Sequence, residues 1–196
     1  MNGNLAYKLD GHFDEPWEER IRGKIIMMAP ALVNHNRVAF NIAGVFRDYL
    51  KGRRCEYFPD GTGLFLSEEE HYVPDGMVVC DPDKVSDRGV TGAPDLVVEV
   101  LSRSTARNDR GHKKNIYERY GVREYWIVDP VVLSVEQYVL EEGQFVLRDV
   151  YHKYSSSERE AMNEEERSAI VTEFPCAIFD DLMISIEEVF GRVTVR

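Results

Sequence analysis

A glutamate inside an apolar run at residues 96–101 constrains the fold more than any other feature of the sequence. The run reads Leu-Val-Val-Glu-Val-Leu and lies between Gly-Ala-Pro and Ser-Arg-Ser. A short, almost continuous β-branched run predicts a central strand that is buried on both faces. Burial makes the charge of Glu99 costly unless it is paired or bound to a cation. Glu99 is therefore either half of a buried salt bridge to an arginine or part of a functional site.

The remaining pattern predicts a mixed α/β fold, with a mixed central β-sheet flanked by α-helices. No repeat or linker divides the chain, so we expect residues 1–196 to form one domain. The expected strands are residues 21–29, 55–58, 62–66, 72–79, 96–101, 125–128 and 133–140. The expected helices are 33–50, capped by Asn34, and 105–120, capped by Ser104 or Thr105 and ended by Gly121. Beyond residue 143 we expect one or two strands, an exposed acidic loop near 157–167 and a short C-terminal helix.

Composition narrows the class of protein. No apolar run approaches the roughly 20 residues that span a bilayer, and the first residues lack the basic stretch and apolar core of a secretory signal. Cys55, Cys80 and Cys176 are widely spaced, so we expect buried small hydrophobes and neither a disulfide framework nor a zinc cluster. These features predict a cytoplasmic protein without a membrane partner.

Charge is distributed unevenly along the chain. The formal net charge of −11 argues against a surface coated for non-specific nucleic-acid binding. Residues 151–196 hold ten acids against five Lys or Arg, whereas residues 99–125 hold seven Lys or Arg against four acids. The stretch 47–54 is also basic. An acidic body with two basic stretches can still bind an anion locally.

Two aspartates could share a site with Glu99, and geometry separates them. Asp95 lies four residues earlier on the same strand, roughly 13 Å away at about 3.3 Å per residue, so it is expected to anchor the preceding loop. Asp75 opens another expected strand, and the 24 residues to Glu99 let the chain return beside it. Two carboxylates on adjacent strands repel unless a divalent cation lies between them, and hard oxygen ligands favour magnesium or manganese.

The expected helix 105–120 places a lysine near these carboxylates. One stripe at i, i+3, i+4 spacing contains Asp109, His112, Lys113, Ile116, Tyr117 and Tyr120. Ile116 and Tyr120 identify the inward face, so Lys113 is expected to point inward and Lys114, about 100° away, toward solvent. The alternative is that this charge run forms a solvated helix surface.

Several motifs together resemble the Uma-type restriction endonuclease family of the PD-(D/E)XK nuclease superfamily. The resemblance covers about residues 17–150, and its most specific block is 92–130. It is carried by Gly-Ala-Pro-Asp-Leu-Val-Val-Glu-Val-Leu-Ser at 92–102, Ser-Thr at 104–105, Asp109, Lys113 and Tyr117, Gly-Val-Arg-Glu-Tyr-Trp-Ile-Val-Asp-Pro at 121–130, the Gly23 turn, Met-Ala-Pro at 28–30, and Pro74-Asp75. It implies a restriction-endonuclease-like core.

The resemblance also implies a reaction, the hydrolysis of nucleic-acid phosphodiesters, with DNA as the expected substrate. Asp75, Glu99 and the Val100 carbonyl would hold magnesium or manganese. The superfamily lysine usually lies two residues after the glutamate, where this chain has Leu101, so Lys113 is implied to substitute for it. Its role would be to orient water and offset transition-state charge, with metal binding and folding nearly unaffected in Lys113→Ala.

Other positions are implied to support or extend this site. The supporting residues are Glu19, His35, Asp95, Asp109 and Tyr117, although His35 could simply help to cap its helix. The residues expected to steer phosphates are Arg107, Arg110 and Lys114. Arg103 replaces a common proline and is expected to change only the loop.

Alternative functions remain open at this stage. One is a catalytically silent nucleic-acid or protein-binding module on the same fold, and another is a metal-free carboxylate hydrolase such as a glycosidase. A homodimer is expected because nucleases that cut both strands commonly work in pairs. Residues 125–128 and 131–140 offer surface for it, unless they are wholly core.

Overall fold

The computed structural model describes residues 18–27 and 30–194, and a six-stranded mixed sheet forms its centre. The strand order is β12-β11-β10-β9-β6-β3, and only β9 and β10 in this sheet pair in parallel. Its strands are β3 (Glu56–Pro59), β6 (Gly76–Val79), β9 (Leu96–Val100), β10 (Glu124–Asp129), β11 (Ser134–Glu141) and β12 (Gln144–His152). Every residue of β9 is buried, so the prediction of a central strand is confirmed.

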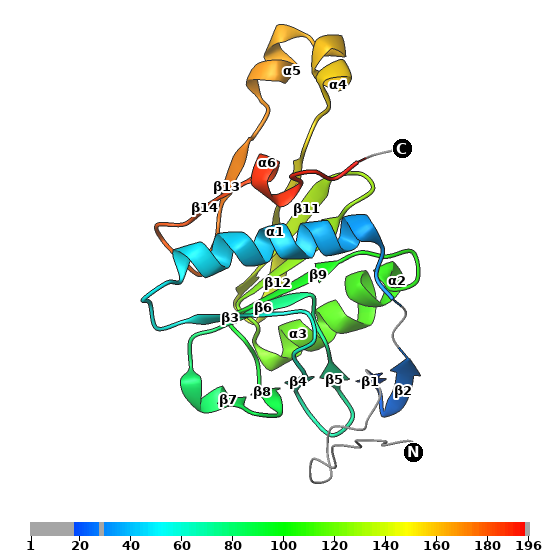
Figure 1. The fold of residues 1–196 in the computed structure, drawn as a ribbon, viewed down its shortest axis with the longest axis vertical. Helices are drawn as coiled ribbons and strands as arrows, with labels where there is room; N and C mark the ends of the chain where they lie inside the picture. Colours follow the sequence, from blue (N-terminus) through cyan, green and yellow to red (C-terminus); the bar gives the residue numbers. More distant parts are fainter. Residues whose placement is uncertain (1–17, 28–29, 195–196) are drawn as a thin grey trace, which may run out of the picture.

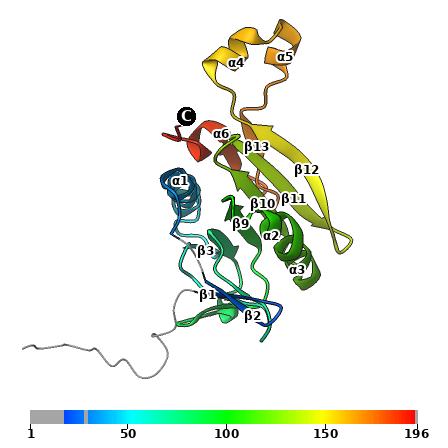
Figure 2. The ribbon, with the colours of Figure 1, turned by 90° about the vertical axis from the view of Figure 1, so that its right-hand side faces the viewer.

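Helices cover both faces of this sheet (Figure 2). On one face, Val38, Ile42 and Phe46 of α1 (Val33–Tyr49) pack against Val98 and its neighbours in the core. On the other face, Val97 packs in the same core cluster as Ile116 and Tyr117 of α3 (Lys114–Tyr120). Side chains alternate along a strand, so Glu99 lies on the α3 face together with Val97.

A second sheet of short strands extends the core on the α3 side, and sequence analysis did not predict it. Its order is β2-β1-β5-β4-β8-β7. Its strands are β1 (Glu18–Ile21), β2 (Lys24–Met27), β4 (Leu64–Phe65), β5 (His71–Tyr72), β7 (Val85–Ser86) and β8 (Gly89–Thr91), and the short 3-10 helix η1 (Pro82–Lys84) precedes β7. Figure 1 shows these strands below the large sheet.

Two predicted strands are divided in the structure. The segment predicted as 21–29 contains the last residue of β1, a turn and β2, because Arg22 and Gly23 have positive φ and turn the chain back into a hairpin. Residues 28–29 lie outside the described part, so the Met-Ala-Pro motif is described only at Pro30. The segment predicted as 72–79 is interrupted before Gly76, since Pro74 has no N–H for a ladder. Asp75 therefore lies where the chain passes from the small sheet to the large one.

The predicted helix 105–120 is present, but a π turn lies inside it. It consists of α2 (Ala106–Asn108), the π segment η2 (Asp109–Lys113) and α3. Gly121 ends it in the left-handed conformation, as predicted. Thr105 is the N-cap residue, as predicted, but its side chain makes no capping hydrogen bond. The predicted Asn34 cap is wrong: α1 begins after Leu32, and Asn34 donates from its side chain to the Thr194 carbonyl.

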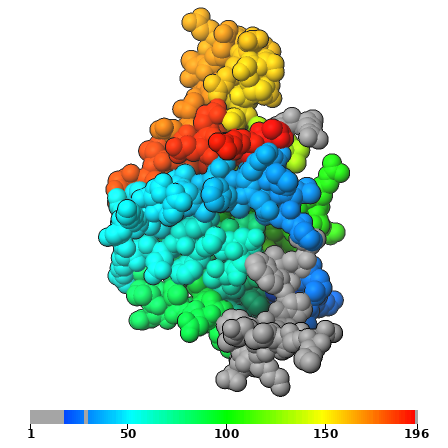
Figure 3. Space-filling model, viewed as in Figure 1, coloured from blue at the N-terminus to red at the C-terminus, as the bar shows by residue number. Residues whose placement is uncertain are grey.

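The acidic segment near 157–167 is an exposed pair of helices, which corrects the predicted loop. α4 (Ser156–Ala161) and α5 (Glu164–Ser168) each begin with a capping box, Ser155 with Glu158 and Asn163 with Glu166. They project from the body as an arm (Figures 1 and 3). Below the arm lie the strands β13 (Glu173–Pro175) and β14 (Met183–Ser185) and the predicted C-terminal helix, α6 (Ile186–Val189).

The prediction that the cysteines form no disulfide is wrong for two of them. Cys55 and Cys80 are bonded to each other. They come directly before β3 and directly after β6, and the pairing of Glu56 with Val79 brings them opposite each other. No local pattern around either cysteine indicated that pairing. Cys176 is free and buried, as predicted.

The core position of β10 changes the expectation about self-association. Tyr125, Trp126, Ile127 and Val128 are each 0% exposed, so this strand cannot supply a surface for a partner. Val131 and Val132 in the following turn are exposed. The homodimer remains a prediction. Among the helices of the described residues, none has the length and apolar character needed to cross a bilayer.

Candidate active site

The residues singled out in the sequence meet at one cavity of about 670 Å³. Its polar lining comes from β1, the start of α1, the β3–β4 and β5–β6 connections, β9, the β9–α2 connection, α2 and the π segment. The predicted site residues that line it are Glu19, His35, Asp75, Glu99, Val100, Asp109 and Lys113. Figure 2 shows α1, β1 and β9, which carry His35, Glu19 and Glu99 respectively.

Asp75 and Glu99 are neighbours across two adjacent strands, as predicted. Gly76 of β6 pairs with Val98 of β9, so continuing the antiparallel register by one residue brings Asp75 opposite Glu99. Asp75 Oδ2 accepts a hydrogen bond of 2.6 Å from the Val100 N–H. Its other oxygen, Oδ1, lies 3.2 Å from His35 Nε2. Asp75 is thus held at the edge of β9 by both the strand and α1.

Lys113 points into the cavity floor, which confirms its predicted orientation. Its side chain is buried, and Nζ lies 2.7 Å from Glu19 Oε1, 3.1 Å from Glu99 Oε1 and 3.7 Å from Asp109 Oδ1. Lys114 takes another direction and places Nζ 4.1 Å from the centre of the Tyr138 ring. One ammonium group therefore balances three buried carboxylates.

Burial and mutual charge determine the protonation of this cluster. Burial raises the pKa of Glu99 well above its usual value, although the nearby charge of Lys113 acts in the opposite direction. Burial alone would lower the pKa of Lys113, but the charges of Glu99, Glu19 and Asp109 outweigh it and hold that pKa well above its usual value. Lys113 is therefore a permanent cation in the folded protein.

Two further side chains complete the floor. Tyr117 donates a hydrogen bond of 2.7 Å to Glu99 Oε1, and burial raises the pKa of its hydroxyl well above the ordinary value, so it stays a donor. Asp109 is 1% exposed, and burial raises the pKa of its carboxyl. Its backbone carbonyl accepts from the Tyr125 hydroxyl at 3.0 Å.

His35 and Asp60 lie on the side of the cavity next to Asp75. Burial alone would lower the pKa of His35, but the hydrogen bond and charge of Asp75 raise it above its usual value overall. Sequence reasoning missed Asp60, which also lines the cavity. Burial and then the charge of Asp75 raise the pKa of Asp60. Its only sequence signal was a Pro-Asp-Gly turn, which is typical of a loop.

Other predicted residues lie away from the floor. Asp95 accepts from the Cys80 N–H at 2.8 Å and from Arg123 at 3.1 Å, which confirms that it anchors the loop before β9. Arg110 is paired with Glu136 at 2.7 Å. Arg107 is exposed on α2. Of the three residues expected to steer phosphates, Arg110 therefore already has a carboxylate partner.

The donors at this floor suit a small, hard cation. Mg²⁺ is usually held by one or two carboxylates, with water and substrate phosphate completing the shell. Asp75 and Glu99 supply two carboxylates, and Val100 also lines the cavity. The Val100 N–H faces Asp75, and the carbonyl of a strand residue points to the same side as its N–H. Within the described ranges, no group of three or more His, Cys, Asp or Glu is placed to hold a metal alone. The residues that could hold such an ion are therefore Asp75, Glu99 and the Val100 carbonyl, with water and phosphate as further ligands.

This fold, with two carboxylates on adjacent strands and a lysine beside them, is that of the restriction-endonuclease-like α/β proteins. A solved structure titled as a putative nuclease of DUF820 from Anabaena variabilis has a TM-score of 0.67 and 19% identity, over 91% of this chain and 92% of that one. That likeness concerns the fold.

The family follows from sequence comparison. The family model Uma2, described as putative restriction endonuclease, matches residues 7–168, and the chain belongs to this family. Two uncharacterised proteins of Synechocystis sp. are similar to it. One is 35% identical over 61% of this chain and 70% of its own length. The other is 33% identical over 70% of both chains.

Proposed function

We propose that this protein is a metal-dependent endonuclease that hydrolyses nucleic-acid phosphodiester bonds, with DNA as its substrate. The observation that carries the proposal is the meeting of Asp75, Glu99 and Lys113 at one cavity floor. The family and the nuclease-like fold support the reaction class. A cavity that combines carboxylates with a permanent cation suits a phosphate held through a divalent ion.

The chain's own residues have separable roles in this mechanism. Asp75, Glu99 and the Val100 carbonyl would hold magnesium or manganese, which when bound polarises the phosphate and lowers the pKa of a bound water. Lys113 donates N–H groups toward the attacking water and the charge that develops on the phosphate oxygens. Tyr117 fixes the orientation of Glu99 through its hydrogen bond.

Glu19 acts on the reaction only through Lys113. Its Oε1 accepts from Lys113 Nζ and, at 3.2 Å, from the Val73 N–H. The Val73 backbone thus fixes Glu19, and Glu19 fixes the ammonium. Glu19 is a positioning residue in this proposal.

A cleavage assay tests the proposal. Supercoiled, linear and single-stranded DNA are incubated with magnesium, manganese or chelator, and Glu99→Gln serves as the inactive variant. We expect cleavage that requires metal and is lost in Glu99→Gln. Cleavage that persists in chelator would indicate a metal-free hydrolase. Absence of both cleavage and magnesium-dependent thermal stabilisation would indicate a silent binding module.

A further inference from the structure

The cavity has two walls of opposite chemistry. Ile26 and Met27 at the end of β2, together with Leu32 before α1, form an apolar wall. Ser102, Ser104 and Asn108, from the β9–α2 connection and α2, form a polar wall. The elements that carry both walls are visible in Figure 2.

The apolar wall is exposed to solvent, whereas the floor is not. Met27 is 64% exposed and Leu32 is 73% exposed, but Glu99 is 3% exposed. Phosphodiester hydrolysis needs the floor and has no use for apolar side chains, since a phosphate has no apolar surface. A base does have one, because both of its faces are flat and weakly polar. An apolar patch continuous with a reaction site is therefore best explained as a contact for bases.

Base stacking limits which bases can reach that wall, which borders a cavity of about 670 Å³. In a duplex the base faces are stacked on one another and hidden from a protein wall. An unpaired nucleotide exposes its faces and can enter the cavity with its phosphate toward the floor.

We infer that the substrate is a nucleic acid whose nucleotides are unpaired at the cut, such as a single strand or a flap, with its bases against Met27 and Leu32. This inference rests on the proposed nuclease function and specifies its substrate class. The sugar–phosphate chain then runs along the polar wall, where hydroxyl and amide groups can hydrogen-bond to it.

The test compares one DNA sequence in two forms. A fluorescein-labelled single strand and the same strand annealed to its complement are cleaved in magnesium by wild type and by Met27→Ser/Leu32→Ser. We expect wild type to cleave the single strand at least about tenfold faster, and the double variant to lose about tenfold in kcat/KM on the single strand alone. Serine is a favoured N-cap residue, so the change at Leu32 preserves the start of α1.

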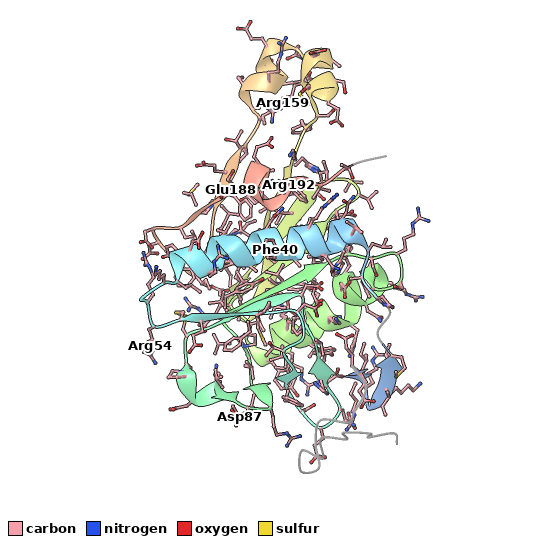
Figure 4. The ribbon with its side chains drawn as sticks, viewed as in Figure 1. Phe40, Arg54, Asp87, Arg159, Glu188 and Arg192 are labelled. Atoms are coloured by element: carbon pink, nitrogen blue, oxygen red, sulfur yellow. A yellow bond between two sulfur atoms is a disulfide. The ribbon has the colours of Figure 1, made fainter. Side chains whose placement is uncertain are left out.

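A matched control removes apolar side chains of similar exposure outside this cavity. Phe40 is 74% exposed in the middle of α1 (Figure 4), and Met183 is 53% exposed on β14. Phe40→Ser/Met183→Ser should cleave both DNA forms at wild-type rates. An equal loss in the control would overturn the assignment of the wall.

The remaining outcomes separate this inference from the proposed function. Faster cleavage of the duplex, unchanged in the wall variant, overturns the inference and leaves the nuclease intact. A third outcome is that wild type does not cleave DNA but binds the single strand, as measured by fluorescence anisotropy, and that the wall variant loses this binding. That result overturns the proposed nuclease activity and supports the contact between bases and the apolar wall. Absence of both cleavage and binding overturns both. A wild-type dimer that becomes a monomer in the wall variant would show that the wall instead binds a second copy.

Discussion

Two buried glutamates on neighbouring parallel strands show how similar positions acquire different roles. Glu99 on β9 is 3% exposed and Glu124 on β10 is 0% exposed. Glu124 shares its face with Trp126 on the α1 side of the sheet, whereas Glu99 lies on the α3 side. Both carboxylates are taken out of water, and each must be compensated by its surroundings.

The compensation differs in kind. Glu124 accepts from four neutral donors: the Trp126 indole at 2.7 Å, the Gln137 amide at 2.6 Å, the Ile178 N–H at 3.0 Å and the Cys176 thiol at 3.4 Å. Glu99 has a buried cation and a phenol as partners and borders a cavity. Full enclosure by neutral donors characterises a structural carboxylate, and an open side with a charged partner leaves Glu99 available for a ligand.

The sharpest test of the comparison is catalytic. Glu99→Gln should reduce metal-dependent cleavage on the order of 10³-fold, because it removes an anionic metal ligand and each 1.4 kcal/mol is a factor of ten. Folding should change by less than about 1 kcal/mol, since Gln resembles the protonated carboxyl that burial favours at this position. Single-turnover cleavage and urea unfolding measure the two effects. If this variant cleaved at the wild-type rate, Glu99 would be a structural residue like Glu124.

Removing the cation should damage both function and folding. Sequence reasoning predicted that Lys113→Ala leaves folding nearly intact, but its burial among Glu19, Glu99 and Asp109 changes this expectation. Loss of one partner of a buried charge cluster costs about 3–5 kcal/mol at neutral pH. We expect the variant to lose most cleavage and to show this deficit in urea unfolding with chelator present.

The loss of stability in Lys113→Ala should depend on pH in a defined direction. Burial raises the folded-state pKa of Glu99 and Asp109, and without Lys113 it rises further. A carboxyl whose pKa is higher in the folded than in the unfolded state destabilises the protein at pH values above its unfolded-state pKa. The free energy of unfolding therefore falls as pH rises from the unfolded-state pKa to the folded-state pKa. The deficit of Lys113→Ala should therefore shrink as pH falls toward about 4.5. A deficit independent of pH would mean that lost packing, and not charge, is responsible.

The complementary test concerns the structural glutamate. Glu124→Gln should lower the free energy of unfolding by about 2 kcal/mol, because one side-chain oxygen becomes an NH₂ group that faces other donors. Cleavage per folded molecule should stay at the wild-type level. Urea unfolding and the cleavage assay at a temperature where the variant is folded test both parts. A specific catalytic loss would show that the two faces of the sheet are coupled.

The smallest effect is expected at the lysine next to the site lysine. Lys114 lies over Tyr138 and not in the cavity. Lys114→Ala should cost less than about 1 kcal/mol in stability through the lost cation–π contact. It should lower the salt dependence of DNA binding by about one unit of slope, with cleavage at saturating DNA unchanged. If Lys114 were essential and Lys113 dispensable, the described helix orientation would be wrong.

Strong local patterns allowed much of the structure to be predicted. The β9 run and the stripe of helix 105–120 identified the central strand and the inward direction of Lys113, because burial leaves a direct mark on residue type. The small sheet was missed since its strands are only two to four residues long. Strands this short carry no periodicity, and their pairings depend on distant segments.

Features that depend on pairing between distant segments also could not be predicted from the sequence. The Cys55–Cys80 bond depends on the register of β3 and β6, and no local signal reports that register. Asp60 enters the cavity because its N–H donates to the Asp75 carbonyl at 3.1 Å, a contact between distant segments, yet its own residues predict only a turn. The catalytic roles of Asp75, Glu99 and Lys113 remain predictions, and their shared location is what the structure adds.

The π turn between α2 and α3 holds one residue more than the α turn it replaces. Because the wider turn absorbs that residue, α2 keeps nearly the phase relative to α3 that a regular helix without it would have. Deleting a single position there, for example Gly111, should therefore restore a regular helix and leave Tyr117 at Glu99. A one-residue deletion inside α3 should instead rotate everything before it by about 100° and turn Lys113 away from the cavity. The effect of a deletion in this helix thus depends on whether it falls in the π segment.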